Sequence, residues 1–249
     1  MQPIQNIAAY RFVSIADSDA VAVWIKDLCV RLQLMGTVLV SPEGINIFLA
    51  GSSEAIDAFL VELNRDDRFA GIPVKYSQSA FVPFKRLRVK RKKEIITYRD
   101  ASLQPEQGRA PSVTPETLAR WLDSGKDDDG REVVLLDTRN IDEVVHGSFS
   151  KALVFPINRF TDLPKAVELL KPELEGKTIV SFCTGGIRCE KSVLRMQNDG
   201  YQHCYQLEGG ILGYFEKVGG RHYDGRCFVF DDRIALDPSL APLVDDIGF

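Results

Sequence analysis

Apolar residues in the first third of the chain recur with the two-residue period of strands and, between those stretches, with the wider spacing of helices. Strands are predicted at 6–13, 37–40 and 45–49, and near 73–77 and 86–98. One helix begins at Asp17 or Ser18 and ends at Gly36, and a second begins at Ser52 or Ser53. The order β-α-β-β-α-β predicts a ferredoxin-like α+β domain, which we place at residues 1–100.

Strands and helices alternate through most of the remaining chain. A segment with Pro105, Gly108 and Pro111 is predicted to be a linker at 101–113. Thr114 and Pro115 then begin a helix. The later elements are predicted as strands at 133–136 and 177–182, helices at 161–170 and 190–198, and a strand ending at 206–210. The alternation predicts a parallel, doubly wound α/β domain at 114–218, followed by a tail at 219–249.

Cys183 follows directly on the buried strand 177–182 and opens a short loop. The loop consists of Thr184, Gly185, Gly186 and Ile187, and it closes on Arg188 at the start of a helical pattern. Backbone N–H groups of such a loop point at the sulfur, and the helix N-terminus adds a partial positive charge. Together with Arg188 they should lower the pKa of the Cys183 thiol well below its usual value of about 8.5. A buried cysteine is commonly just a small apolar core residue, but two glycines and an arginine so close by favour a catalytic thiolate.

The length of this loop limits the chemistry. Four residues separate Cys183 from Arg188, so the cradle has room for a single small atom or anion above the sulfur. Cysteine phosphatases usually need a longer loop to hold a phosphate, and phosphatase activity is therefore the least favoured reading.

Three nearby residues are candidates for supporting roles. Asp137 and Arg139 follow the apolar strand 133–136, at the edge where open α/β sheets place their sites. They are expected either to contact the Cys183 loop or to cap the next helix and pair with surface neighbours. Cys189 lies in the first turn of the helix after the loop, where it is either a resolving thiol or second acceptor, or a small residue facing the core.

The predicted strand near 86–98 carries the only dense basic run of the sequence. Its cations are Lys85, Arg86, Arg88, Lys90, Arg91, Lys92 and Lys93. Leu87 and Val89 alternate with them, so a strand would bury the apolar pair and present cations on the other face. Such a face either binds RNA phosphates or protects an edge strand against aggregation.

Composition sets the remaining expectations for this chain of 249 residues and formal net charge −4. The five cysteines, Cys29, Cys183, Cys189, Cys204 and Cys227, do not form a disulfide framework, and Cys29 belongs to a buried helical stripe. No apolar run reaches the length of a membrane span, and the start has no signal-peptide pattern, so a cytoplasmic protein is expected. No metal-ligand spacing, dinucleotide fingerprint or haem motif is present, and no cofactor is predicted from the residues.

Residues 183–188 resemble the active-site loop of rhodanese domains, whose cysteine carries a persulfide. The wider sequence resembles the rhodanese-containing tRNA uridine hydroxylase family, and five stretches carry the likeness: 36–46, 83–90, 136–140, 183–191 and 205–212. The resemblance covers both domains and runs to about Leu236. It implies an acylphosphatase-like (ferredoxin-like) first domain and a rhodanese-like second domain. Many members continue into a cysteine-rich extension, which this sequence does not include before Phe249.

The same resemblance implies a reaction: oxygen-dependent hydroxylation of the wobble uridine of tRNA at C5, with molecular oxygen as co-substrate. The Cys183 thiolate would attack C6 of the uracil ring, and residues 184–188 would hold an oxygen or sulfur atom. An alternative is sulfur transfer, in which Cys183 carries a persulfide from a sulfur donor, and a reductant is a possible further partner. A third reading, a non-catalytic RNA-binding module, fits poorly because Cys183 and Arg188 are both intact.

Overall fold

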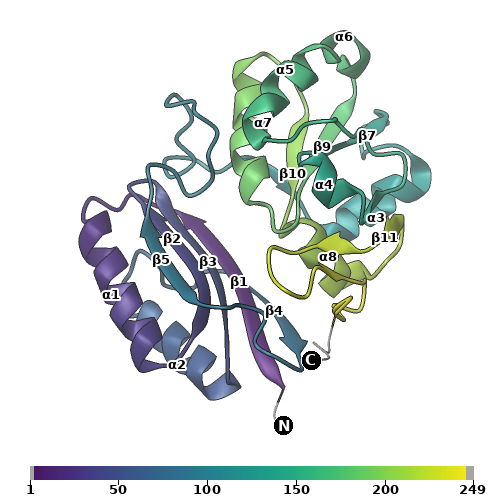
Figure 1. The fold of residues 1–249 in the computed structure, drawn as a ribbon. Helices are drawn as coiled ribbons and strands as arrows, with labels where there is room; N and C mark the ends of the chain where they lie inside the picture. The colour runs from purple at the N-terminus through teal and green to yellow at the C-terminus, as the bar shows by residue number, and fades with distance from the viewer. Residues whose placement is uncertain (1–2, 245–249) are drawn as a thin grey trace. The chain divides into compact units, whose positions relative to one another are not determined.

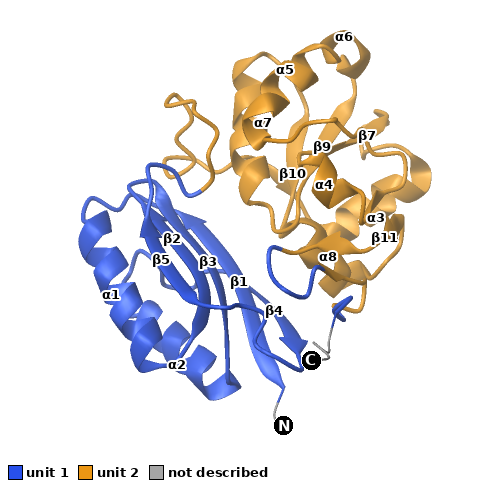
Figure 2. Ribbon diagram, viewed as in Figure 1, with its two compact units in different colours: residues 1–95, 230–234, 241–249 blue, residues 96–229, 235–240 orange. Residues whose placement is uncertain are grey.

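A computed structural model describes residues 3–244, which divide into two compact units. Figure 2 shows the division: unit 1 takes residues 1–95, 230–234 and 241–249, and unit 2 takes 96–229 and 235–240. Each unit has its own sheet and its own hydrophobic core. Within the described residues, no helix is both long enough and apolar enough to cross a membrane.

Unit 1 is built on one five-stranded sheet (Figure 1). Its elements are β1 (Ile4–Phe12), α1 (Ser18–Arg31), β2 (Met35–Ser41), β3 (Gly44–Gly51), α2 (Ser53–Leu63), β4 (Val74–Ser79) and β5 (Leu87–Arg91). The strand order β4-β1-β3-β2-β5 contains the antiparallel ferredoxin-like arrangement, to which β5 adds a parallel edge strand next to β2. The predicted fold of this part is confirmed.

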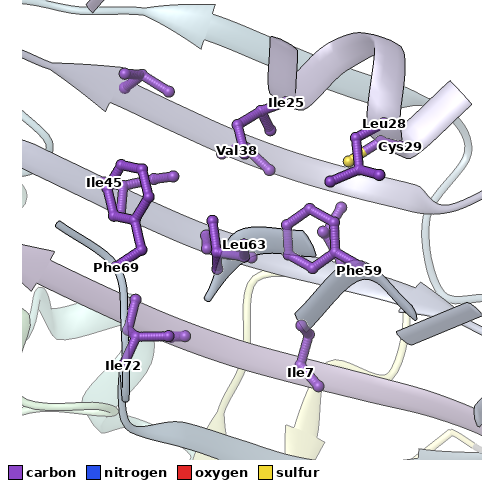
Figure 3. Packing of buried hydrophobic residues seen from close by; sticks show 14 of the residues in the cluster. Ile7, Ile25, Leu28, Cys29, Val38, Ile45, Phe59, Leu63, Phe69 and Ile72 are labelled. Atoms are coloured by element: carbon purple, nitrogen blue, oxygen red, sulfur yellow. The ribbon is translucent and has the colours of Figure 1, made fainter. Parts of the chain in front are cut away.

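Both helices of unit 1 cover the same face of the sheet (Figure 1). Their inward side chains meet the apolar residues of the strands in one buried cluster, shown in Figure 3. Cys29 of α1 lies in this cluster, fully buried, and burial raises the pKa of its thiol to about 12. It is the core residue that its place in the helical stripe predicts.

Unit 2 is a parallel α/β sandwich. Its elements are β6 (Ser112–Val113), α3 (Pro115–Ser124), β7 (Val133–Asp137), α4 (Ile141–Val144), β8 (Gly147–Phe149), η1 (Phe160–Asp162), α5 (Leu163–Glu168), α6 (Lys171–Leu174), β9 (Thr178–Phe182), α7 (Ile187–Asn198), β10 (Cys204–Leu207), α8 (Gly210–Val218), β11 (Tyr223–Gly225), β12 (Cys227–Phe228) and β13 (Ala235–Leu236). The sheet order is β6-β10-β9-β7, and every pairing in it is parallel. Helices α3 and α8 pack into one core cluster, and α5 and α7 pack into another on the opposite face. The predicted doubly wound domain is confirmed.

Several predicted boundaries differ from the structure. Helix α1 ends at Arg31 rather than at Gly36, which lies in β2, and the helix predicted at 161–170 is the short η1 followed by α5. The basic strand is much shorter than 86–98, because its partner β2 ends at Ser41 and the last paired residues are Val40 and Arg91. Helix α7 begins at Ile187 rather than at Glu190, because Gly186 takes a positive φ of 100° and turns the chain into the helix directly.

The predicted linker and tail are also more structured than expected. Residues 96–113 belong to unit 2, where Ser112 and Val113 form the edge strand β6 beside β10. The predicted tail contributes β11 to a pairing with β8 and forms the small β12–β13 ladder, while residues 230–234 belong to unit 1. Neither stretch has the apolar periodicity that marks longer elements, so the pattern of the sequence did not reveal them.

Candidate active site

Cys183 stands at the carboxyl end of β9, an inner strand of the parallel sheet in unit 2. All five residues of β9 are buried, and the strand delivers Cys183 to the N-terminus of α7 with only 1% of the residue exposed. The backbone N–H of Gly186 donates to Cys183 Sγ at 3.1 Å. The strand, loop and helix therefore position the sulfur as the sequence predicts.

The surroundings of Cys183 favour its thiolate. Burial by itself would raise the pKa of this thiol, but a hydrogen bond with Cys189, the charge of Arg188, and the backbone N–H groups of Arg188 and Gly186 lower it to about 5. The negative charge is thus stabilised by fixed donors rather than by water. These neighbours favour the thiolate of Cys183 at neutral pH, and a thiolate is the nucleophilic form of cysteine.

Cys189 faces the loop and not merely the core. Its side chain is fully buried, and it makes a hydrogen bond with Cys183 and a 3.7 Å contact with Thr138 Oγ1. Burial and the charge of Cys183 hold the pKa of Cys189 well above its usual value, so Cys189 keeps its proton. The pair is therefore one thiolate and one thiol that donates to it.

Arg188 is held by a carboxylate that the sequence analysis did not identify. Its two terminal nitrogens contact the two oxygens of Glu143 in α4 at 2.5 and 2.7 Å, and both side chains are buried. Glu143 Oε1 also accepts from the backbone N–H of Asn140 at 3.1 Å, which fixes the carboxylate at the helix start. The bidentate pair fixes the guanidinium of Arg188 beside the Cys183 loop.

Asp137 and Arg139 do not take either of the roles predicted for them. They are completely buried and pair with each other through two contacts, at 2.9 and 2.6 Å. Arg139 also donates to Gly147 O at 2.7 Å, Ser148 donates to Asp137 at 2.8 Å, and the N-cap of the next helix, α4, is Asn140. The pair thus fastens the start of β8 to the carboxyl end of β7, where Asp137 pairs with Phe182 of β9.

Helix α8 closes the site from the side opposite α7. The backbone N–H groups of Ile211 and Leu212 donate to the carbonyls of Cys183 and Thr184 at 2.9 and 3.0 Å. Gly210 approaches the loop so closely that a Cβ at this position would lie 2.4 Å from Cys183 O. Only glycine fits there, and its φ of 60° is also one that other residues rarely adopt.

The first turns of α7 carry two further buried charges that the sequence analysis missed. Glu190 accepts from the Arg109 side chain at 2.8 and 2.9 Å and from Ala110 N at 3.1 Å. Lys191 donates to Ile96 O at 3.1 Å. These contacts tie to α7 both Arg109 and Ala110, in the predicted linker 101–113, and Ile96, which was predicted to belong to the first domain. Two adjacent charged residues directly after Cys189 indicated in the sequence that this turn carries charge, but the sequence did not identify the partners of Glu190 and Lys191.

The basic run lies in unit 1, and all seven of its cations are exposed. Leu87 and Val89 pack against the core of unit 1, as the alternation predicts. Arg88 and Lys90, which alternate with them, lie on the face of the sheet opposite the helices. Arg91 forms an ion pair with Asp19 of α1, with Nε and Oδ1 3.3 Å apart.

Within residues 3–244, no group of three or more histidine, cysteine or acidic side chains is arranged to hold a metal ion. His222 contacts Asp123 at 2.9 Å, and the ring of His146 lies 5.3 Å from that of Phe228. Neither contact belongs to the Cys183 loop.

Comparison with known proteins agrees with both units. Residues 4–95 match the model of the UPF0176 acylphosphatase-like domain, and residues 114–217 match that of the rhodanese-like domain. The chain is therefore a two-domain protein in which a rhodanese-like domain carries the Cys183 loop.

Relatives of the whole chain define the family more narrowly. A protein of Bordetella avium is 59% identical over 240 residues, which are 96% of this chain and 99% of that one. Proteins of Xanthomonas euvesicatoria (57% identical, 97% and 98% of the two chains) and Cupriavidus metallidurans (56%, 96% and 85%) are similarly close. All three are named tRNA uridine(34) hydroxylase, and the present chain belongs to this family.

Proposed function

We propose that this protein hydroxylates uridine 34 of tRNA at C5, with molecular oxygen as co-substrate. The observation that carries the proposal is the Cys183 thiolate, with a pKa of about 5, in a chain whose full-length relatives are named tRNA uridine(34) hydroxylase. The proposal places the enzyme and its tRNA in the cytoplasm.

The reaction begins on the uracil ring. Cys183 attacks C6, and the electron pair of the C5–C6 double bond becomes an enolate whose nucleophilic carbon is C5. Carbon C5 is then able to react with oxygen, which it does not do in uracil itself. The N–H of Gly186 and the fixed charge of Arg188 stabilise negative charge at the loop before attack and again when Cys183 leaves.

Unit 1 supplies the contact with RNA in this proposal. The seven cations of residues 85–93 are exposed, and the strand β5, which carries three of them, is held by its pairing with β2. Lysine and arginine on such a surface bind phosphates without reading the sequence, so they position the tRNA rather than select it. In this proposal the Cys183 site, and not the basic surface, selects uridine 34.

The test is nucleoside mass spectrometry of tRNA from cells that lack the gene. We expect 5-hydroxyuridine and its derivatives to disappear, and to return with the wild-type gene but not with Cys183→Ala. Loss of a thiolated nucleoside instead would identify the protein as a sulfurtransferase that carries a persulfide on Cys183. Unchanged tRNA would overturn the proposal.

A further inference from the structure

Cys183 and Cys189 form a buried dithiol at the start of α7. Their sulfurs share a hydrogen bond, and the N–H of Cys189 bonds to Gly186 O at 3.0 Å, so that one turn of backbone fixes both residues. Thr138 Oγ1, in the residue that follows β7, lies 3.7 Å from Cys189 Sγ and positions the second thiol. Two thiols in contact at a reactive centre are able to give up two electrons by forming a disulfide.

The proposed reaction needs two electrons. When one atom of molecular oxygen enters C5 of uridine, the other leaves as water, and its reduction takes two electrons and two protons. Oxidation of two thiols to one disulfide releases two electrons and two protons. The inference drawn below rests on the proposed function.

We propose that Cys183 and Cys189 together reduce the second oxygen atom, with Cys183 as nucleophile and Cys189 as the thiol that cleaves the O–O bond. The overall reaction converts uridine, molecular oxygen and two thiols into 5-hydroxyuridine, water and one Cys183–Cys189 disulfide. An external thiol or dithiol reductant then restores the pair for the next turnover.

The steps follow the positions of the two sulfurs. Cys183 bonds to C6, and the enolate at C5 gives two electrons to oxygen, which with one proton leaves a hydroperoxide on C5. The sulfur of Cys189 attacks the outer oxygen and the O–O bond breaks. The inner oxygen keeps the electron pair and takes the Cys189 proton, and Cys189 becomes a sulfenic acid. Loss of the C5 proton expels the Cys183 thiolate, which attacks the sulfenic sulfur and releases its oxygen as water.

The charges of the site make the two thiols act in this order. Burial raises the pKa of Cys189 most, and the hydrogen bond and negative charge of the Cys183 thiolate raise it further. Once Cys183 is bonded to C6 that charge is gone, whereas the charge of Arg188, which favours a Cys189 thiolate, remains. Bonding of Cys183 to the substrate therefore removes two of the causes that raise the pKa of Cys189 and makes its sulfur a better nucleophile at that step.

A third buried cysteine lies near the loop but is placed differently. The thiol of Cys227 makes a hydrogen bond with Thr184 rather than with Cys183. Burial raises the pKa of this thiol to about 12. It is the natural competitor for the role of Cys189. Cys204 lies on β10, where its Sγ contacts Gln202 O at 3.3 Å, and serves as a matched buried control.

The test is a single-turnover reaction of reduced wild-type protein, freed of added reductant, with unmodified tRNA in aerated buffer. We expect at most one 5-hydroxyuridine per protein, two thiols lost for each, and a peptide that joins Cys183 to Cys189 in mass spectrometry. Turnover that continues without thiol loss, or a disulfide from Cys183 to Cys227, would overturn the inference.

Two variants distinguish a chemical role of Cys189 from a purely structural one. Cys189→Ala should lower the single-turnover yield at least tenfold, whereas Cys204→Ala should match wild type. Each protein is assayed well above the pKa of its own Cys183, so that lost ionisation does not explain a lower yield. A Cys189→Ala protein with the wild-type yield would refute the role of Cys189. If the wild type makes no 5-hydroxyuridine even with added dithiothreitol, the proposed function itself fails.

Discussion

At the scale of single residues, the site depends on a small number of buried charges that compensate one another. The thiolate of Cys183 is next to Arg188, and Arg188 is paired with Glu143. An isolated charge in a buried position is costly, whereas a hydrogen-bonded set of opposite charges is tolerated. The site is therefore ready as a thiolate before any substrate binds.

The ionisation of Cys183 gives a prediction for pH. The far-ultraviolet absorbance of the thiolate, taken as wild type minus Cys183→Ala, should appear as pH rises through about 5. Because the folded pKa lies below the ordinary value of about 8.5, the thiolate contributes stability in full above that pH and loses it as pH falls through about 5.

Cys189→Ala should move this transition to higher pH, because the variant lacks the hydrogen bond from Cys189 that lowers the pKa of Cys183. Cys204→Ala is the control and should leave the transition unchanged. A wild-type transition near pH 9 would show that the loop does not stabilise the thiolate.

At the scale of elements, the Cys183 loop is held between two helices. Helix α7 supplies N–H groups to the sulfur, and α8 supplies N–H groups to the loop carbonyls. The contact with α8 requires Gly210, since any Cβ there would meet the backbone of residues 183–186. The position of α8 therefore determines the shape of the cradle.

Gly210→Ala tests this dependence. The added methyl group would lie 2.4 Å from Cys183 O, so we expect a lower free energy of unfolding and loss of the low-pH thiolate. Gly125→Ala is the matched control, because Gly125 has a similar φ of 71° but nothing within 4 Å of the added Cβ. It should cost about 1 kcal/mol of backbone strain alone. Equal effects of the two substitutions in urea unfolding would show that the contact with α8 is unimportant.

The part of the site that is contiguous in sequence was predictable, and the part assembled by packing was not. Cys183, its glycines and Arg188 follow one another along the chain, so their spacing alone indicated a thiolate loop. Glu143 is 45 residues from Arg188, and their pairing depends on how α4 packs beside α7. Apolar residues beyond Arg91, such as Ile95, extended the predicted strand because sequence does not show where its partner strand ends.

At the scale of the whole molecule, the chain combines an exposed basic strand in unit 1 with a buried thiolate in unit 2. The net charge of −4 would not suggest an RNA-binding protein, and the local run of cations is what supports the proposal. The fold of each unit was predictable because its apolar periodicity is strong. The structure of 96–113 and of 219–244 was not, because short strands and irregular segments have no such signature.

RNA binding by β5 is tested through salt. The double substitution Arg88→Ala and Lys90→Ala should weaken tRNA binding and make its dependence on log salt less steep by about 1.4, for two lost phosphate contacts. Lys26→Ala with Arg31→Ala on α1 removes the same charge from exposed positions and should have little effect. Equal weakening by both pairs would contradict a specific role for β5.

The central claim is that Cys183 directs oxygen into uridine 34, and oxygen labelling tests it most directly. Purified, reduced protein is incubated with unmodified tRNA under oxygen gas of the heavy isotope, and the nucleosides are analysed by mass spectrometry. We expect heavy oxygen in 5-hydroxyuridine with wild type and no product with Cys183→Ala. Product whose oxygen comes from water, or product formed by Cys183→Ala, would contradict the account.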